Sequence, residues 1–117
     1  MSTDCIFCKI AAGLIPAQKI YEDDEVVAFH DLHPVAPVHV LIVPRHHAED
    51  LLDLAADSAG GAVISSVLRA LPAVAEIAGV AENGFRLINN CGADGGQTIR
   101  HVHFHLIGGR AFGEKLL

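Results

Sequence analysis

The chain has 117 residues, of which 51% are hydrophobic, and a formal net charge of −6 at pH 7, which suits one domain spanning residues 1–117. Its eight lysines and arginines are thinly spread, which argues against a groove that follows a nucleic-acid backbone. No continuous apolar run approaches the ~20 residues that cross a membrane, and the N-terminus lacks a signal-peptide pattern, so we expect a cytoplasmic protein.

The predicted elements are short strands arranged around one long helix. In chain order they are a helix over residues 5–12, strands over 19–22 and 26–30, a loop over 32–37, a strand over 39–43, a polar segment with a helical turn or two over 46–57, a long helix over 62–78, a strand over 84–89, a glycine-rich loop over 92–96 and a strand over 101–107. This order predicts an α+β fold with a mostly antiparallel five-stranded sheet.

The long helix carries one apolar stripe at steps of three and four residues, formed by Val63, Val67, Leu71, Val74 and Ala78. Pro72 lies inside this pattern, where it should kink the helix or cost ~3 kcal/mol. Gly79 suits the C-terminal end of the helix.

Three histidines alternate with apolar residues in the last predicted strand. His101, His103 and His105 should share one face, while Val102 and Phe104 turn toward the core. A strand whose histidines merely face water is one interpretation, and a metal site is a second. Residues i and i+4 on a strand lie ~13 Å apart, however, whereas zinc–nitrogen bonds are ~2.1 Å, so one ion cannot hold all three rings.

The interpretation we prefer is nucleophilic catalysis. A neutral imidazole can attack phosphorus, and a neighbouring ring can then bind the phosphate or protonate the leaving group. The loop before this strand has three glycines in five residues, followed by Gln97 and Thr98. Such a loop is most often a plain turn, but here it predicts a cradle of N–H groups for a phosphate.

The residues 101–107, His-Val-His-Phe-His-Leu-Ile, resemble the signature of the histidine triad nucleotide hydrolases. The resemblance extends in order through Cys5-Ile-Phe-Cys-Lys-Ile, Tyr21-Glu-Asp-Asp, Ala28-Phe-His-Asp, Pro37-Val-His-Val-Leu-Ile-Val-Pro, Asn90 and Gly95-Gly-Gln-Thr. It is similar to the Hint-like branch, the purine nucleoside phosphoramidases, because Gly108-Gly-Arg follows the triad.

The resemblance implies a two-step hydrolysis through a nucleotidyl-histidine, with no metal required for catalysis. His103 matches the nucleophile, and His105 matches the contact to the phosphate and leaving group. His39 and His101 match the rest of the active-site histidine set, and His39 would orient His103 through a hydrogen bond. The implied nucleotide-binding residues, in addition to His103 and His105, are Ile6, Phe29 and His30 at the base, Asp31 at the ribose, and Asn90, Gly96, Gln97 and Thr98 at the phosphate and leaving group.

The pair Cys5 and Cys8 has the C-x-x-C spacing of half a tetrahedral zinc site. In some bacterial members of the family, zinc is also held by the first triad histidine and by a histidine after the Pro-x-x segment. The resemblance therefore implies a structural zinc with His47 and His101 as further ligands, and His46 is the off-register alternative. The other interpretation is two buried helix thiols and no metal. Cys91 is expected to be a small loop residue.

The resemblance favours an enzyme that hydrolyses AMP or GMP conjugates, with purines preferred. The alternatives are a dinucleoside polyphosphate hydrolase and a zinc-stabilised nucleotide-binding or scaffold protein without turnover. We also expect a homodimer, with the long helix and the strand over 84–89 at the interface, so that the sheet extends across both subunits.

Overall fold

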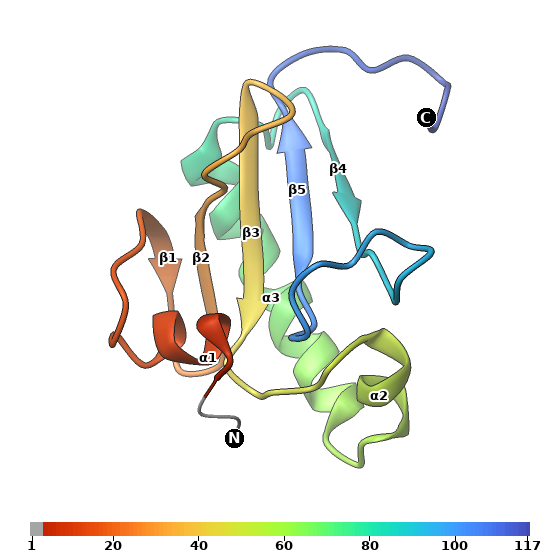
Figure 1. The fold of residues 1–117 in the computed structure, drawn as a ribbon. Coiled ribbons are helices and arrows are strands. Elements are labelled where there is room, and N and C mark those ends of the chain that lie inside the picture. Colours follow the sequence, from red (N-terminus) through yellow and green to blue (C-terminus); the bar gives the residue numbers. More distant parts are fainter. Residues whose placement is uncertain (1–3) are drawn as a thin grey trace.

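The computed structural model describes residues 4–117 as a five-stranded antiparallel sheet with helices on both faces (Figure 1). The strand order is β1-β2-β3-β5-β4. The elements are α1 (Ile6–Ala11), β1 (Lys19–Glu22), β2 (Val26–His30), β3 (Val38–Pro44), α2 (Leu51–Ala56), α3 (Gly60–Ala78), β4 (Phe85–Ile88) and β5 (Phe104–Gly108). The predicted α+β class, the five strands and the long helix are confirmed.

Alternation along the strands separates two apolar layers. Val26 and Ala28 of β2 and Val40 and Ile42 of β3 belong to the core that α3 covers, together with Val102, Phe104 and Leu106. The residues between them, Val27, Phe29, Leu41 and Val43, pack against α1 instead. In Figure 1, α3 lies behind the sheet and α1 in front of its lower part. Because Leu41 pairs with His105, the ring of His105 belongs to the face on the α1 side.

Helix α1 is one residue shorter at each end than predicted. Cys5 is its N-cap, with its Sγ accepting a hydrogen bond from the backbone N of Cys8 at 3.3 Å. Ala12 is the C-cap, and Gly13 follows with a φ of 77°, a left-handed conformation that favours glycine. The helix end is therefore fixed by the residues that the sequence indicated.

The predicted apolar stripe of α3 faces the sheet. Val63, Val67 and Val74 are buried in the core, and the helix continues through Pro72. Its 19 residues are long and apolar enough, by length and composition alone, to cross a membrane, although they contain no continuous apolar run of that length. Here the helix packs against β1, β2 and β3, as the core helix of a two-layer domain does.

The prediction that the last strand begins at His101 is wrong, because β5 begins at Phe104. The backbone N of Val102 donates to the carbonyl of Ala48 at 2.8 Å, and the carbonyl of His103 accepts from Asn89 Nδ2 at 2.9 Å. Residues 101–103 are thus tied to two distant segments and do not join the β-ladder. The apolar residues of this stretch still enter the core, so only the backbone course differs from the prediction.

Candidate functional site

His39 and His105 lie beside each other on adjacent strands. The Nε2 of His39 is 2.9 Å from the Nδ1 of His105. Because the backbone N of Val35 donates to His39 Nδ1 at 3.1 Å, the proton of a neutral His39 ring is on Nε2 and is donated to His105. His105 then carries its own proton on Nε2, for which no partner is found among residues 4–117. This ring is oriented to donate a hydrogen bond to a ligand.

His103 has the opposite arrangement of its two nitrogens. Its Nδ1 lies 2.7 Å from the carbonyl oxygen of His101, and a carbonyl can only accept, so Nδ1 carries the proton. The Nε2 of a neutral ring therefore keeps its lone pair. The ring packs against that of His105 at a centroid distance of 5.1 Å and against the edge of Phe7 at 5.0 Å. These contacts hold a nucleophilic nitrogen next to a hydrogen-bond donor.

The expectation that His39 orients His103 is wrong. His39 contacts His105, and the tautomer of His103 is set by the backbone of His101. This difference follows from the geometry of β3 and β5, which pair His39 with Ile107 and Leu41 with His105, so both histidines lie on one face. His103 precedes β5 and lies beyond the reach of this pairing.

Burial favours the neutral form of the His103 and His105 rings. It lowers the pKa of His103 and of His105 below the ordinary value for histidine, and the neighbouring rings of His103 and His39 lower the pKa of His105 further. The Asp31 carboxylate acts against both shifts, and its Oδ2 lies 3.4 Å from His39 Nε2. A neutral imidazole is the form that can attack an electrophile.

Two cysteines and two histidines form a second cluster at the lower end of β3. The Sγ of Cys5 is 3.2 Å from His101 Nδ1, and the Sγ of Cys8 is 3.3 Å from His47 Nδ1. The two Nδ1 atoms are 3.1 Å apart, and all four ligand atoms lie within 4.8 Å of one another. Ligands at ordinary zinc distances would be roughly 3.3 to 3.8 Å apart in a tetrahedron, which the observed spacing approaches.

The protonation of this cluster also fits a metal ion. His101 Nε2 donates to the carbonyl of Pro44 at 2.8 Å, so its Nδ1 lone pair points at the cysteines. Burial is the main cause that lowers the pKa of His101 to about 4. Burial, together with the hydrogen bond and charge of Cys5, raises the pKa of Cys8 to about 11, so an arriving ion must displace a proton from that thiol. His46, the off-register alternative, instead contacts Asp57 at 2.6 Å.

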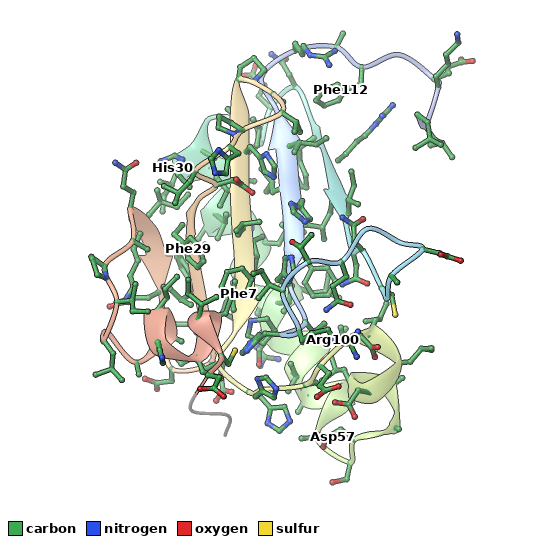
Figure 2. The ribbon with its side chains drawn as sticks, in the orientation of Figure 1. Phe7, Phe29, His30, Asp57, Arg100 and Phe112 are labelled. Carbon is green, nitrogen blue, oxygen red and sulfur yellow. The ribbon has the colours of Figure 1, made fainter. Side chains whose placement is uncertain are left out.

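A cavity of about 340 Å³ opens on the α1 face, a volume typical of a small-ligand site. Five of the residues predicted to bind nucleotide line it, namely Ile6, Phe29, His30, Asp31 and Thr98. Phe7, Ile10, Ile15 and Leu41 add an apolar wall, and Figure 2 shows Phe7 and Phe29 on neighbouring elements. The cavity thus combines a largely apolar lining with one carboxylate, that of Asp31.

Comparison with known proteins identifies the chain. The HIT domain family matches residues 12–112. The chain belongs to the HIT family. It is 41% identical to the purine nucleoside phosphoramidase of Escherichia coli over 99% of this chain and 96% of that protein. It also resembles the solved structure of a histidine triad protein from Clostridium difficile, at 44% identity, 98% coverage of each chain and a TM-score of 0.90.

A second solved structure, a HIT family hydrolase from Clostridium thermocellum, matches with a TM-score of 0.92 and 41% identity over the whole of both chains. The fold of this HIT protein is therefore shared over its full length with proteins of the same family. Such relatives support a hydrolase activity.

The glycine-rich loop of this HIT domain differs from the predicted phosphate cradle, because several of its hydrogen-bonding groups already have partners within the protein. The N–H of Gly96 donates to Ala93 and that of Gln97 donates to Gly92, at 3.0 and 3.1 Å. The Gln97 side chain accepts from the backbone of Gly92 and donates to the carbonyls of Glu49 and Ile99. These groups brace the loop and do not form a free cradle in this conformation. Asn90 is half-buried where the loop begins.

Two residues that contact the site of this HIT protein were not predicted from the sequence. Phe7 lies between Cys5 and Cys8, and its ring makes T-shaped contacts with the rings of both His101 and His103. Asn89 holds the carbonyl of His103. The signal for Phe7 is its place inside the C-x-x-C pair. For Asn89, the signal is a polar residue that follows Phe85 and Leu87 on the apolar face of a strand.

A larger cavity, about 440 Å³, lies at the other end of the HIT fold between the end of α3 and the C-terminal tail. Its lining includes Asn83 and Arg110 but no histidine, cysteine or carboxylate. This cavity offers no nucleophile or base. The region around His103 and His105 is therefore the better candidate active site, although the cavity near it is smaller.

Proposed function

We propose that the protein is a nucleotidyl hydrolase that cleaves nucleoside 5′-phosphoramidates or related AMP and GMP conjugates. The observation that carries the proposal is the hydrogen bond from His103 Nδ1 to the carbonyl of His101, which leaves the Nε2 lone pair for attack on phosphorus. The E. coli relative, named as a purine nucleoside phosphoramidase, supports this substrate class.

In the first step, a bond forms between His103 Nε2 and the α-phosphorus, and the phosphorus–nitrogen bond of the substrate breaks. The positive charge that His103 acquires is stabilised by the carbonyl of His101. The departing amine needs one proton, which His105 supplies from its protonated form, the form that burial disfavours and the Asp31 carboxylate favours. Asp31, near the His39–His105 pair, favours that positive charge.

In the second step, neutral His105 takes a proton from a water molecule that attacks the phosphorus. The bond between phosphorus and His103 breaks, releasing the nucleoside monophosphate and restoring both rings. No step in this sequence uses a metal ion. The pair His39 and His105 thus handles protons, and His103 carries the covalent intermediate.

The 340 Å³ cavity suits the nucleoside part of such a substrate. Phe29 and Ile6 would flank the base, and apolar walls of this kind discriminate loosely between bases. Asp31 would accept hydrogen bonds from the ribose hydroxyls, although its Oδ1 already accepts from the backbone N of His33 at 2.7 Å. The second carboxylate oxygen is the better candidate for the sugar.

The test is hydrolysis of adenosine 5′-phosphoramidate by wild-type protein and by His103→Asn, in which the side-chain amide can still donate to the His101 carbonyl. We expect the variant to lose at least about 10⁴-fold in kcat, with His46→Asn as an unaffected histidine control. Mass spectrometry of rapidly quenched wild-type protein should find one attached nucleotidyl group. Equal activity of the wild type and the His103 variant would rule out the covalent mechanism.

The same assay separates the alternatives. Faster turnover of a dinucleoside polyphosphate than of the phosphoramidate would favour the polyphosphate hydrolase. Nucleotide binding without measurable turnover of either substrate would favour a binding or scaffold protein.

We also propose that Cys5, Cys8, His47 and His101 hold a structural zinc ion. Two soft thiolates and two neutral imidazoles, whose ligand atoms lie within 4.8 Å of one another in a partly buried cluster, are a ligand set that zinc prefers. The bound ion would cross-link α1 to the segment before β5 and fix the ring of His101. It would stabilise the fold without taking part in the hydrolysis.

We propose a homodimer because α3 covers one side of the sheet and leaves the edge strand β4 only half-buried. Helix α3 packs over β1, β2 and β3, whereas the four residues of the edge strand β4 are all only half-buried. On α3, Ile64 and Leu71 flank Leu68, which is 56% exposed. A second copy related by a twofold axis would cover Leu68 and its neighbours on α3 and would continue the sheet through β4.

A further inference from the structure

The strand β4 ends next to the proposed nucleophile. Its ladder with β5 runs from Phe85, opposite Gly108, to Ile88, opposite His105. Two more pairs in this antiparallel register would bring Asn90 opposite His103 and give His103 a backbone partner. The ladder stops instead, and the side chain of Asn89 supplies the donor, with Nδ2 at 2.9 Å from the carbonyl of His103.

This contact fixes His103 at a second point. The ring is held through Nδ1 by the carbonyl of His101 at 2.7 Å, and the main chain is held by Asn89. The edge of Phe7 closes a third side at 5.0 Å. A nucleophile that lies outside a ladder depends on such contacts to keep its attacking nitrogen in place.

Packing alone does not explain why an asparagine occupies position 89, because burying its amide destabilises the fold. Phe85 and Leu87, at the alternate positions before it, contact the core under α3. Asn89 continues that alternation with an amide whose Oδ1 is buried and has no hydrogen-bond partner among the described residues. A buried acceptor without a partner destabilises the fold, and an apolar residue of similar shape would avoid the penalty.

We propose that Asn89 is a positioning residue for the reaction, which holds the backbone of His103 so that Nε2 meets the phosphorus. It acts through His103 and does not touch the substrate. This inference rests on the proposed function, in which His103 is the nucleophile. It predicts that a substitution at position 89 can lower the activity of the protein without lowering its stability.

The experiment compares wild-type protein with Asn89→Leu, which keeps the branching at Cγ while removing both the donor and the unpaired acceptor. Asn83→Leu, in the exposed turn before β4, is the matched control. We expect kcat for adenosine 5′-phosphoramidate to fall at least about tenfold, KM to stay within about twofold and Tm to stay unchanged or rise. The imidazole ¹⁵N signals of His103 should show a second ring environment. Unchanged kcat and unchanged signals in a folded Asn89→Leu protein would overturn the proposal.

Two further measurements keep the inference testable if the leucine variant does not fold. In the wild-type protein, the Asn89 side-chain amide protons should exchange slowly with solvent, and exchange at the rate of a free amide would overturn the proposal. Asn89→Asp keeps the shape but removes the amide donor, and it should lower kcat as well; wild-type kcat in that variant would also overturn it. If His103→Asn is as active as the wild type, the proposed function fails. If His103 is essential and Asn89→Leu behaves as wild type, only this inference fails.

Discussion

The Nε2 of His39 donates to the Nδ1 of His105, at 2.9 Å, and not to His103. This relationship divides the histidines into a proton-handling pair on the ladder of β3 and β5 and a nucleophile just before β5. His39 therefore influences the reaction only through the ring that it orients.

Replacing His39 by Phe should lower kcat about 10²-fold, because the ring shape is kept while the hydrogen bond to His105 is lost. The measurement is steady-state hydrolysis of adenosine 5′-phosphoramidate by the single variants and by the double variant with His105→Asn. In the His105→Asn background, removing His39 should have almost no further effect. Independent, additive losses would contradict the assignment of His39 to His105.

Replacing Cys8 by Ser should release zinc and lower Tm on the order of 10 °C, because a buried four-ligand site stabilises the folded state through metal binding. Metal analysis by mass spectrometry and a thermal melt check both effects. Cys91→Ser, which changes a free thiol outside the cluster, is the control and should keep full zinc content. A zinc content that Cys8→Ser leaves unchanged would refute the ligand set.

Asp23 should make the fold sensitive to acid. Burial alone would raise its pKa, but hydrogen bonds from Tyr21, Glu25 and Val26 and the charge of Arg45 outweigh burial and lower the pKa below its usual value. Its stabilising effect is therefore present above the unfolded pKa of about 4 and is lost as the pH falls through the lower folded pKa.

In Asp23→Asn, the free energy of unfolding should be about 1 kcal/mol lower at pH 7, with the gap closing toward pH 2. Urea unfolding at several pH values measures the gap, and Asp24→Asn in the same turn is the control. A gap that stays constant over the whole pH range would exclude this linkage.

Introducing a charge at Leu68 should weaken the dimer. Leu68→Glu would bury a carboxylate against its own symmetry copy, so the apparent mass in light scattering should fall toward one chain at micromolar concentration. Glu76→Gln, elsewhere on the same helix, should leave the mass unchanged. A wild-type protein that is monomeric at every concentration would contradict the proposed interface.

The sequence predicted those features that depend on local periodicity. Alternation over residues 101–107 indicated that Val102 and Phe104 enter the core, and the stripe through Val63, Val67 and Val74 indicated the apolar side of α3. The cysteine pair was identified by its spacing, and the resemblance supplied His47 and His101, which the structure brings beside it.

The features that the sequence did not predict arise where distant segments meet. His101 and His103 leave the strand because Ala48 and Asn89 bind that stretch of backbone. Gln97 braces its own loop through Glu49, a residue far away in the sequence. No pattern of period two or 3.6 contains such contacts, because each depends on how two separate elements pack.

The pairing of Leu41 with His105 has a consequence for folding errors. Along β3, the odd-numbered positions lie on the face of the sheet that carries α1 and the site, and the even-numbered positions lie on the face covered by α3. A shift of one residue in the register between the two strands would place His105 in the hydrophobic core and turn Leu106 toward the ligand cavity. A mispaired chain would thus lose the site and the stability of the fold together.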